Sequence, residues 1–138
     1  MPFRRKASGA RVTRVLVGTD LSPTSERAIE WAADLAERFE AELLVLQVVS
    51  ESPAAAAEEL ARFSERVAGP GARTRVATGD DPAAAIVKAV HDEKADVVVL
   101  GSAGMQGRKE FLLGNVPNRV SHNAPCTVVI VDTTGSRK

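Results

Sequence analysis

Apolar runs of strand length alternate with segments of helical periodicity along most of the chain. The runs are Val12 to Gly18, Glu42 to Val49, Arg73 to Thr78, Asp96 to Leu100 and Thr127 to Val131. The third run alternates polar and apolar residues, which is typical of a half-exposed outer strand. The other four have apolar centres, as strands buried on both faces do.

The segments between the runs carry signals of helix starts. A polar residue followed by proline predicts a capped N-terminus with proline at the first helical position. This pair occurs as Ser22-Pro23, Ser52-Pro53 and Asp81-Pro82. We expect the second helix to end near Ala68 and the third near Glu93, and we expect a short last helix from Val116 to His122.

The first of these helices contains the only tryptophan of the chain, Trp31. An apolar stripe at helical spacing is formed by Ala28, Ala32, Leu35 and Phe39. Trp31 widens this stripe, so we predict that it lies in the core. The alternative is that its ring stacks on a nucleotide base.

The alternation of strands and helices favours a parallel sheet, because parallel neighbours need crossover connections and these are right-handed. We therefore expect an α/β fold with a single doubly wound domain over residues 12–132 and helices on both faces of a five-stranded parallel sheet. Residues 1–11 and 133–138 are expected to be flexible tails. Ligands in such folds bind beyond the carboxyl ends of the strands, where the strand order reverses.

A loop rich in glycine follows the fourth strand. The strand ends on Gly101, and Gly104 and Gly114 come before the helix that starts near Val116. Glycine lets backbone N–H groups approach an anion, and a helix N-terminus adds unpaired N–H donors and a favourable dipole, so the placement predicts a phosphate-binding loop. The alternative is a loop whose glycines only serve turns. Neither of the two common phosphate motifs is present.

Composition narrows the class of protein further. The 138 residues include 18 basic and 18 acidic ones, so charge gives no reason to expect nucleic acid or a membrane surface as a partner. The basic start of the chain is expected to be solvated, with anion binding as the alternative. A lone cysteine, Cys126, suits the cytoplasm, which is the expected compartment, and it is predicted to be a buried strand residue. We find no metal or nucleophile set.

Three motifs together resemble the ATP-binding branch of the universal stress protein family. They are the run Val15 to Asp20 with Ser22, the Gly-x2-Gly-x9-Gly loop, and Asn123-Ala124-Pro125-Cys126 before the last strand. The resemblance covers about residues 12 to 132. It implies a sheet with strand order 3-2-1-4-5, a homodimer, and a site between the first and fourth strands.

The resemblance also implies the nucleotide contacts. Asp20 would bind the ribose hydroxyls beside Gly18 and Thr19, Val48 would meet the adenine, and Leu100 and Gly101 would lie against the nucleoside. The phosphates, with any Mg²⁺ or Mn²⁺ that they carry, would be held by Gly104, Arg108, Gly114, Asn115 and Val116. The expected ligand is ATP, and AMP and cyclic AMP are not distinguished from it.

Several site residues have a second interpretation. Asp20 also fits an Asx turn or a cap between strand and helix, and Arg108 also fits a solvated loop charge. Asn115 stands where the family pattern has serine or threonine, although its amide can donate to phosphate. We expect an ATP-binding regulatory protein whose nucleotide state alters its surface and its preference for a still unknown protein partner. The alternatives are a slow ATPase or phosphotransferase, with Glu110 as its one candidate base, and a nucleotide-free interaction module.

The last strand, residues 127–131, is expected at the margin of the sheet. It contains no lysine, proline or charge that would protect an exposed edge. The sequence therefore predicts a homodimer through this strand, with a covering C-terminal tail as the alternative.

Overall fold

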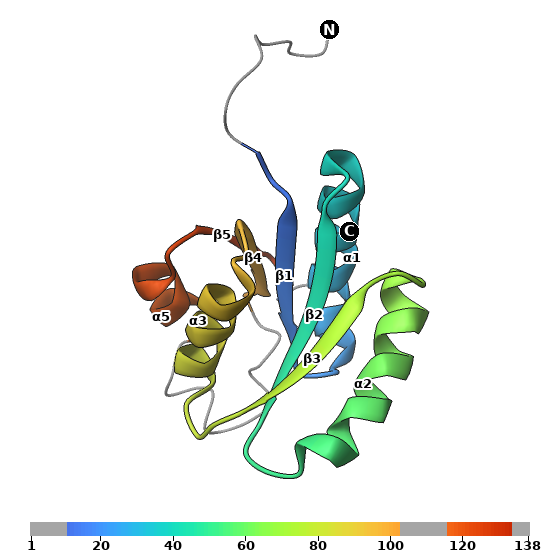
Figure 1. Cartoon of the computed structure of the whole chain (residues 1–138), viewed down its shortest axis with the longest axis vertical. Helices are drawn as coiled ribbons and strands as arrows, with labels where there is room; N and C mark the ends of the chain where they lie inside the picture. The colour runs from blue at the N-terminus through green and yellow to red at the C-terminus, as the bar shows by residue number, and fades with distance from the viewer. Residues whose placement is uncertain (1–10, 103–115, 134–138) are drawn as a thin grey trace, which may run out of the picture.

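The computed structural model describes residues 11–102 and 116–133, which form one sheet with helices on both sides (Figure 1). The elements are β1 (Arg14–Thr19), α1 (Pro23–Phe39), β2 (Glu42–Val49), α2 (Pro53–Ala68), β3 (Arg73–Thr78), α3 (Pro82–Glu93), β4 (Val97–Gly101), α5 (Val116–Asn123) and β5 (Thr127–Val131). All five strands pair in parallel, in the order β3-β2-β1-β4-β5. The predicted fold class and strand order are thereby confirmed.

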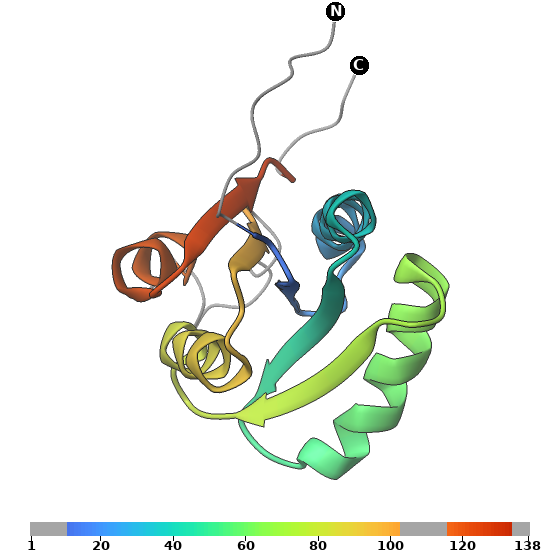
Figure 2. The same cartoon turned by 45° about the horizontal axis from the view of Figure 1, so that its top comes forward.

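The sheet separates two apolar layers. Figure 2, in which the top of Figure 1 comes forward, shows helices on either side of the sheet. Helices α1 and α2 cover one face, and α3 and α5 cover the other. Side chains alternate along each strand, so Val15 and Val17 of β1 enter the first layer while Leu16 enters the second. Burial on both faces explains why the centres of β1, β2 and β4 are continuously apolar.

Two of the three predicted helix caps form as expected. The side chain of Ser22 accepts a hydrogen bond from the backbone N–H of Ser25, and that of Asp81 accepts one from Ala84. Ser52 differs, because its backbone is left-handed (φ 60°) and its side chain makes no capping bond. The prediction of a hydroxyl cap at Ser52 is therefore wrong, although proline still begins α2 there.

The prediction that Trp31 lies in the core is also wrong. Trp31 is 43% exposed and Phe39 is 52% exposed. The face of α1 that packs on the sheet consists of small residues and one isoleucine, namely Ser25, Ala28, Ile29, Ala32 and Ala36. Small side chains let the helix lie close to the strands, which leaves the two large rings at the margins of the contact.

Cys126 lies immediately before β5 and is half-buried, so the prediction of a buried strand residue holds only in part. Partial burial raises the pKa of its thiol. A raised thiol pKa lowers the thiolate fraction at neutral pH and makes Cys126 a poor nucleophile. No helix in the described part of the chain has the length and apolar character needed to span a bilayer.

Asp96 ties β1 to β4 at the amino ends of the strands. Its Oδ2 accepts hydrogen bonds from Thr13 N at 2.8 Å, Thr13 Oγ1 at 2.9 Å and Arg14 N at 3.0 Å. These donors, led by the Thr13 N–H, hold the pKa of Asp96 below its usual value. A lowered pKa means that the link is present at neutral pH and is lost only as the pH falls through that lowered value.

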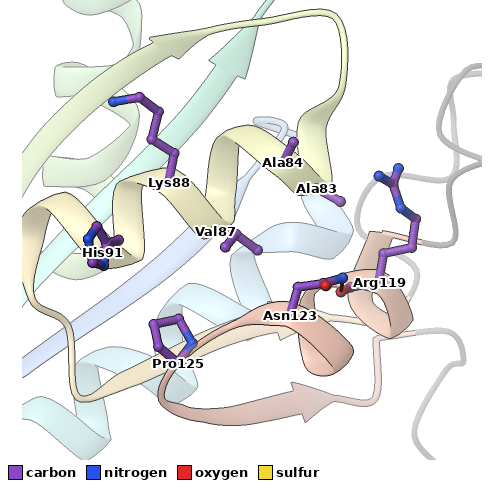
Figure 3. A pocket seen from close by; sticks show the side chains of 8 residues that line it. All are labelled: Ala83, Ala84, Val87, Lys88, His91, Arg119, Asn123 and Pro125. Carbon is purple, nitrogen blue, oxygen red and sulfur yellow. Dashed lines mark hydrogen bonds between the residues drawn. The ribbon is translucent and has the colours of Figure 1, made fainter.

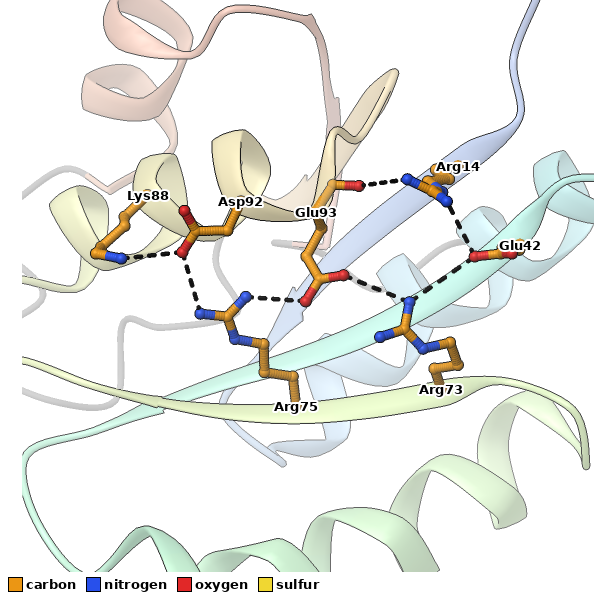
Figure 4. Close-up of polar contacts among 7 residues, drawn as sticks. All are labelled: Arg14, Glu42, Arg73, Arg75, Lys88, Asp92 and Glu93. Atoms are coloured by element: carbon orange, nitrogen blue, oxygen red, sulfur yellow. Dashed lines mark hydrogen bonds and ion pairs between the residues drawn. The ribbon is translucent and has the colours of Figure 1, made fainter.

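An ion-pair network joins the amino ends of β1, β2 and β3 to the end of α3 (Figure 4). Arg73 lies between Glu42 (3.8 Å) and Glu93 (3.4 Å), and Glu93 also pairs with Arg75 at 2.9 Å. The remaining members are Arg14 on Glu42, and Asp92 between Arg75 and Lys88. The network lies at the end of the sheet opposite to the carboxyl ends of the strands.

Candidate functional site

The carboxyl ends of β1 and β4 lie side by side at the point where the strand order reverses. Strand β2, the next along the chain, pairs with one side of β1. Strand β4 pairs with the other side, with Val15 opposite Val97 and Val17 opposite Val99. The two crossovers leave from opposite faces, so a gap opens between them beyond the strands.

A small depression occupies this switch point. Among the described residues it is lined by Gly18, Thr19, Asp20, Ser25, Leu100, Gly101, Val116 and Pro117. The structure thus brings together six of the predicted site residues, from three segments far apart in the sequence. Ser25 and Pro117 were not predicted, because a helix serine and a helix-start proline carry no signal of their own.

The turn after β1 is fixed by buried hydroxyl groups. Thr19 Oγ1 lies 2.7 Å from Ser25 Oγ and accepts the backbone N–H of Leu21 at 3.0 Å. Leu21 has a left-handed backbone (φ 67°), which is uncommon for a residue with a side chain. Strained backbone of this kind clusters at ligand sites, where the surrounding contacts hold it in place.

Asp20 presents its carboxylate at the rim of the depression. Its Oδ1 accepts the backbone N–H of Ser22 at 3.0 Å, so the Asx turn that the sequence allows is present. Within the described residues, Oδ2 makes no hydrogen bond. The turn and a ligand contact are therefore compatible, because one oxygen holds the loop and the other accepts no hydrogen bond from a described residue.

The end of β4 is tied to the end of β5. Ser102 N donates to Val131 O at 2.8 Å, and Ser102 Oγ accepts the N–H of Thr133 at 3.1 Å. The chain therefore leaves β4 from a fixed point. Four predicted phosphate residues come next and lie outside the described residues: Gly104, Arg108, Gly114 and Asn115.

Helix α5 begins at the depression. Val116 and Val120 are buried in the layer between the sheet and α3, and Val116 also lines the depression. The first turn of α5 therefore lies at the switch point, where the positive end of the helix dipole favours an anion.

Two residues in the carboxyl half of β2, Gln47 and Val48, also bear on the site. Val48, the predicted adenine contact, is half-buried and packs against the layer of α3 and α5, outside the depression itself. Its neighbour Gln47 has a buried Oε1 without a hydrogen-bond partner in the part of the chain described. A polar residue inside the apolar run from Leu43 to Val49 is the signal that could have drawn attention to Gln47.

A larger groove of about 660 Å³ lies between α3 and α5, away from the depression (Figure 3). Val87 and Pro125 face one another across it, with His91 toward one end and Arg119 toward the other. None of the predicted site residues is among the described residues that line it. In the described ranges, no three histidine, cysteine or acidic side chains gather as a metal site.

The doubly wound sheet and the depression at its switch point define an α/β domain of the kind that takes ligands at the carboxyl ends of its strands. Comparison with known proteins identifies the family. The model of the universal stress protein family matches residues 11–132. The chain therefore belongs to the universal stress protein family.

The chain is similar to several known proteins. A universal stress protein of Methanocaldococcus jannaschii is 31% identical over 137 residues, which cover 86% of this chain and 81% of that protein. A solved universal stress protein in complex with cAMP is 29% identical, with a TM-score of 0.73 over 91% of this chain and 100% of that one. A protein of Mycobacterium tuberculosis H37Rv is 37% identical, with a TM-score of 0.60 over 92% of this chain and 100% of that one.

Proposed function

We propose that the chain binds ATP at the switch point and acts as a regulatory protein of the cytoplasm. Nucleotide occupancy would change its surface and hence its preference for a protein partner. The change in partner preference can be no larger than the difference in nucleotide affinity between the two states. The protein would act as a homodimer through β5.

One observation carries the proposal. Residues from the ends of β1 and β4 and from α5 line one depression at the switch point, and among them is Asp20, whose Oδ2 makes no hydrogen bond within the described residues. A carboxylate oxygen suits ribose hydroxyls, and the glycines at positions 18 and 101 leave room for a ligand to approach the backbone. The similar protein in complex with cAMP supports an adenine nucleotide as the ligand class.

The residues present fit a nucleotide better than a metal ion bound directly by the protein. In the described part of the site, Asp20 is the one carboxylate that lines the depression. A single carboxylate does not make a cation site, so Mg²⁺ or Mn²⁺ would be held by the nucleotide phosphates. The cation would neutralise phosphate charge, and the chain would orient the nucleoside and the phosphate chain.

Replacing Asp20 by alanine should weaken ATP binding about ten- to a hundredfold. Hydrogen bonds to a charged group contribute about 1.5–3 kcal/mol, and each 1.4 kcal/mol changes an affinity about tenfold. Inorganic triphosphate and 2′,3′-dideoxy-ATP lack the ribose hydroxyls, so neither should bind Asp20→Ala more weakly than wild type. Calorimetric titration of the three ligands measures the difference.

Asp20→Asn is the matched control for the turn. Its amide oxygen still accepts the N–H of Ser22, whereas its NH₂ group replaces the free acceptor. If Asp20→Asn binds ATP as wild type does while Asp20→Ala does not, the residue acts only through the turn. Titration with ATP, AMP and cyclic AMP ranks the three candidate nucleotides in the same experiment.

Hydrolysis of ATP should be slower than about 1 s⁻¹, the low end of common enzyme turnover. A water molecule needs a positioned base, and the carboxylate of Asp20, which lines the described part of the depression, is assigned to the ribose hydroxyls. Glu110, the one candidate base in the sequence, lies outside the described residues. Phosphate release by purified protein with Mg²⁺ measures the rate. Fast turnover that is lost in Glu110→Gln would replace the regulatory proposal with an ATPase.

A further inference from the structure

An ion pair with two parallel hydrogen bonds links α5 to the start of α3. Arg119 Nη1 donates to Asp81 Oδ1 at 2.8 Å, and Arg119 Nη2 donates to Asp81 Oδ2 at 2.7 Å. The Arg119 guanidinium holds the pKa of Asp81 below its ordinary value, so the carboxylate is charged at neutral pH. Bidentate pairing of this kind fixes orientation as well as distance.

The Asp81 end of the pair is anchored to the sheet. Asp81 is the N-cap of α3, and its Oδ1 also accepts the N–H of Ala84 at 3.4 Å. Only Gly79 and Asp80 separate it from the end of β3, and Gly79 N donates to Val49 O at 3.0 Å. The carboxylate is therefore a fixed point at the carboxyl-end side of the sheet.

The Arg119 end lies in the first turn of α5, next to Val116 and the depression. Apolar contacts hold α5 through Val116 and Val120, which lie on the buried face of the helix. On the side facing α3, the groove of about 660 Å³ leaves space between the two helices (Figure 3). Apolar packing holds the buried face of α5 in the layer with α3 and the sheet, and the ion pair adds a polar contact that resists rotation of α5 against α3.

We propose that the Arg119–Asp81 ion pair holds the first turn of α5 in the position that receives the nucleotide phosphates, which makes Arg119 a positioning residue. The part of this inference that concerns phosphate rests on the proposed function. The part that concerns the position of α5 does not require a nucleotide.

Hydrogen–deuterium exchange of the nucleotide-free protein tests whether the Arg119–Asp81 pair fixes the position of α5. Asp81→Asn removes the charge but keeps an oxygen that can cap α3, and Arg119→Gln removes the guanidinium. Both should speed exchange across residues 116–123 about three- to tenfold, because local opening becomes easier. Asp92→Asn is the matched control, since it breaks another ion pair of α3 that does not reach α5. Wild-type exchange in both test variants would overturn the inference.

Binding of ATP and of adenosine tests the positioning of phosphate. Each single variant should weaken ATP about three- to tenfold and leave adenosine unchanged, because only ATP reaches the first turn of α5. The double variant should bind ATP no more weakly than either single variant. Arg119→Lys should bind ATP more tightly than Arg119→Gln, since lysine keeps the positive charge but lacks the bidentate geometry of the guanidinium.

The outcomes separate the inference from the proposed function. If Arg119→Gln still weakens ATP in the Asp81→Asn background, Arg119 contacts phosphate directly and the positioning role is wrong. If the wild type binds neither ATP nor adenosine, the proposed function fails. The exchange experiment then decides by itself whether the ion pair holds α5.

Discussion

Gly104→Val should abolish ATP binding while the circular dichroism spectrum stays native. Gly104 stands in the sequence between the end of β4 and the start of α5, and residues of both elements line the depression at the switch point. A branched side chain there would keep the backbone N–H groups away from phosphate and would strain any position with positive φ. We expect Gly104→Val to lose about 3 kcal/mol of ATP-binding free energy, which weakens the affinity at least about a hundredfold. Calorimetric titration with ATP and Mg²⁺ measures it.

The control for this variant is a second glycine in a turn at the same end of the sheet. Gly79 follows β3, and a Cβ added there would meet Ala85 Cβ at an ordinary 3.6 Å. Gly79→Ala should therefore bind ATP as wild type does, whereas Gly104→Ala should already bind it more weakly. Unchanged affinity in Gly104→Val would show that the glycine loop does not hold the phosphates.

The protein should sediment at twice its 14.6 kDa chain mass at micromolar concentration, through the edge of β5. Thr127 N donates to Asp96 O and Val131 O accepts from Ser102 N, so these β5 residues direct their backbone groups toward β4. Directions alternate along a strand, which leaves the N–H and C=O groups of Val128 and Ile130 at the free edge. A second copy can pair with them about a two-fold axis.

Exposed apolar side chains flank the same edge. Ile130 is 46% exposed. On the other side of the sheet, Arg27 of α1 donates to Asp132 O just after β5, and Trp31 lies one helical turn further along that face. A homodimer through β5 would cover Ile130, and Trp31 offers a second exposed apolar side chain on the helix that contacts Asp132.

Ile130→Lys tests the interface with little cost to the fold, because the side chain is half-exposed and an edge lysine opposes strand pairing. We expect association to weaken about tenfold or more, and Trp31 fluorescence to shift toward that of a solvated ring. Phe39→Lys, at the far end of α1, is the matched control. Proline at Val129 would instead remove an N–H directed toward β4. A wild type that remains monomeric would contradict the interface.

Local pattern was sufficient to predict the fold class and the order of the elements, whereas the strand order was predicted from the family resemblance. Each buried strand has an apolar centre, and proline after a polar residue marks three helix starts, so the element order follows from neighbouring residues alone. The meeting of Asp20 with Gly101 could also be predicted, because the carboxyl ends of adjacent parallel strands share one edge of the sheet.

Contacts that depend on the relative placement of elements could not be predicted. Trp31 is apolar and lies beside the stripe of α1, yet small residues such as Ala32 form the contact with the sheet. Serine often caps a helix, but the backbone of Ser52 is left-handed and its side chain makes no capping hydrogen bond. The Arg119–Asp81 pair joins residues 38 positions apart, and nothing in either local sequence indicates the other.

The ion pairs around Glu93 and the three hydrogen bonds that Asp96 accepts stabilise the amino ends of the strands. The carboxyl ends of the strands lead into the short turns that line the depression. Mobile ions weaken exposed charge pairs, so a rise in salinity acts on the ion-pair network and on the exposed Arg119–Asp81 pair alike. Exchange of arginines and glutamates in the network can adapt the amino ends of the strands to heat or to a saline cell. The residues that line the depression need not change with them.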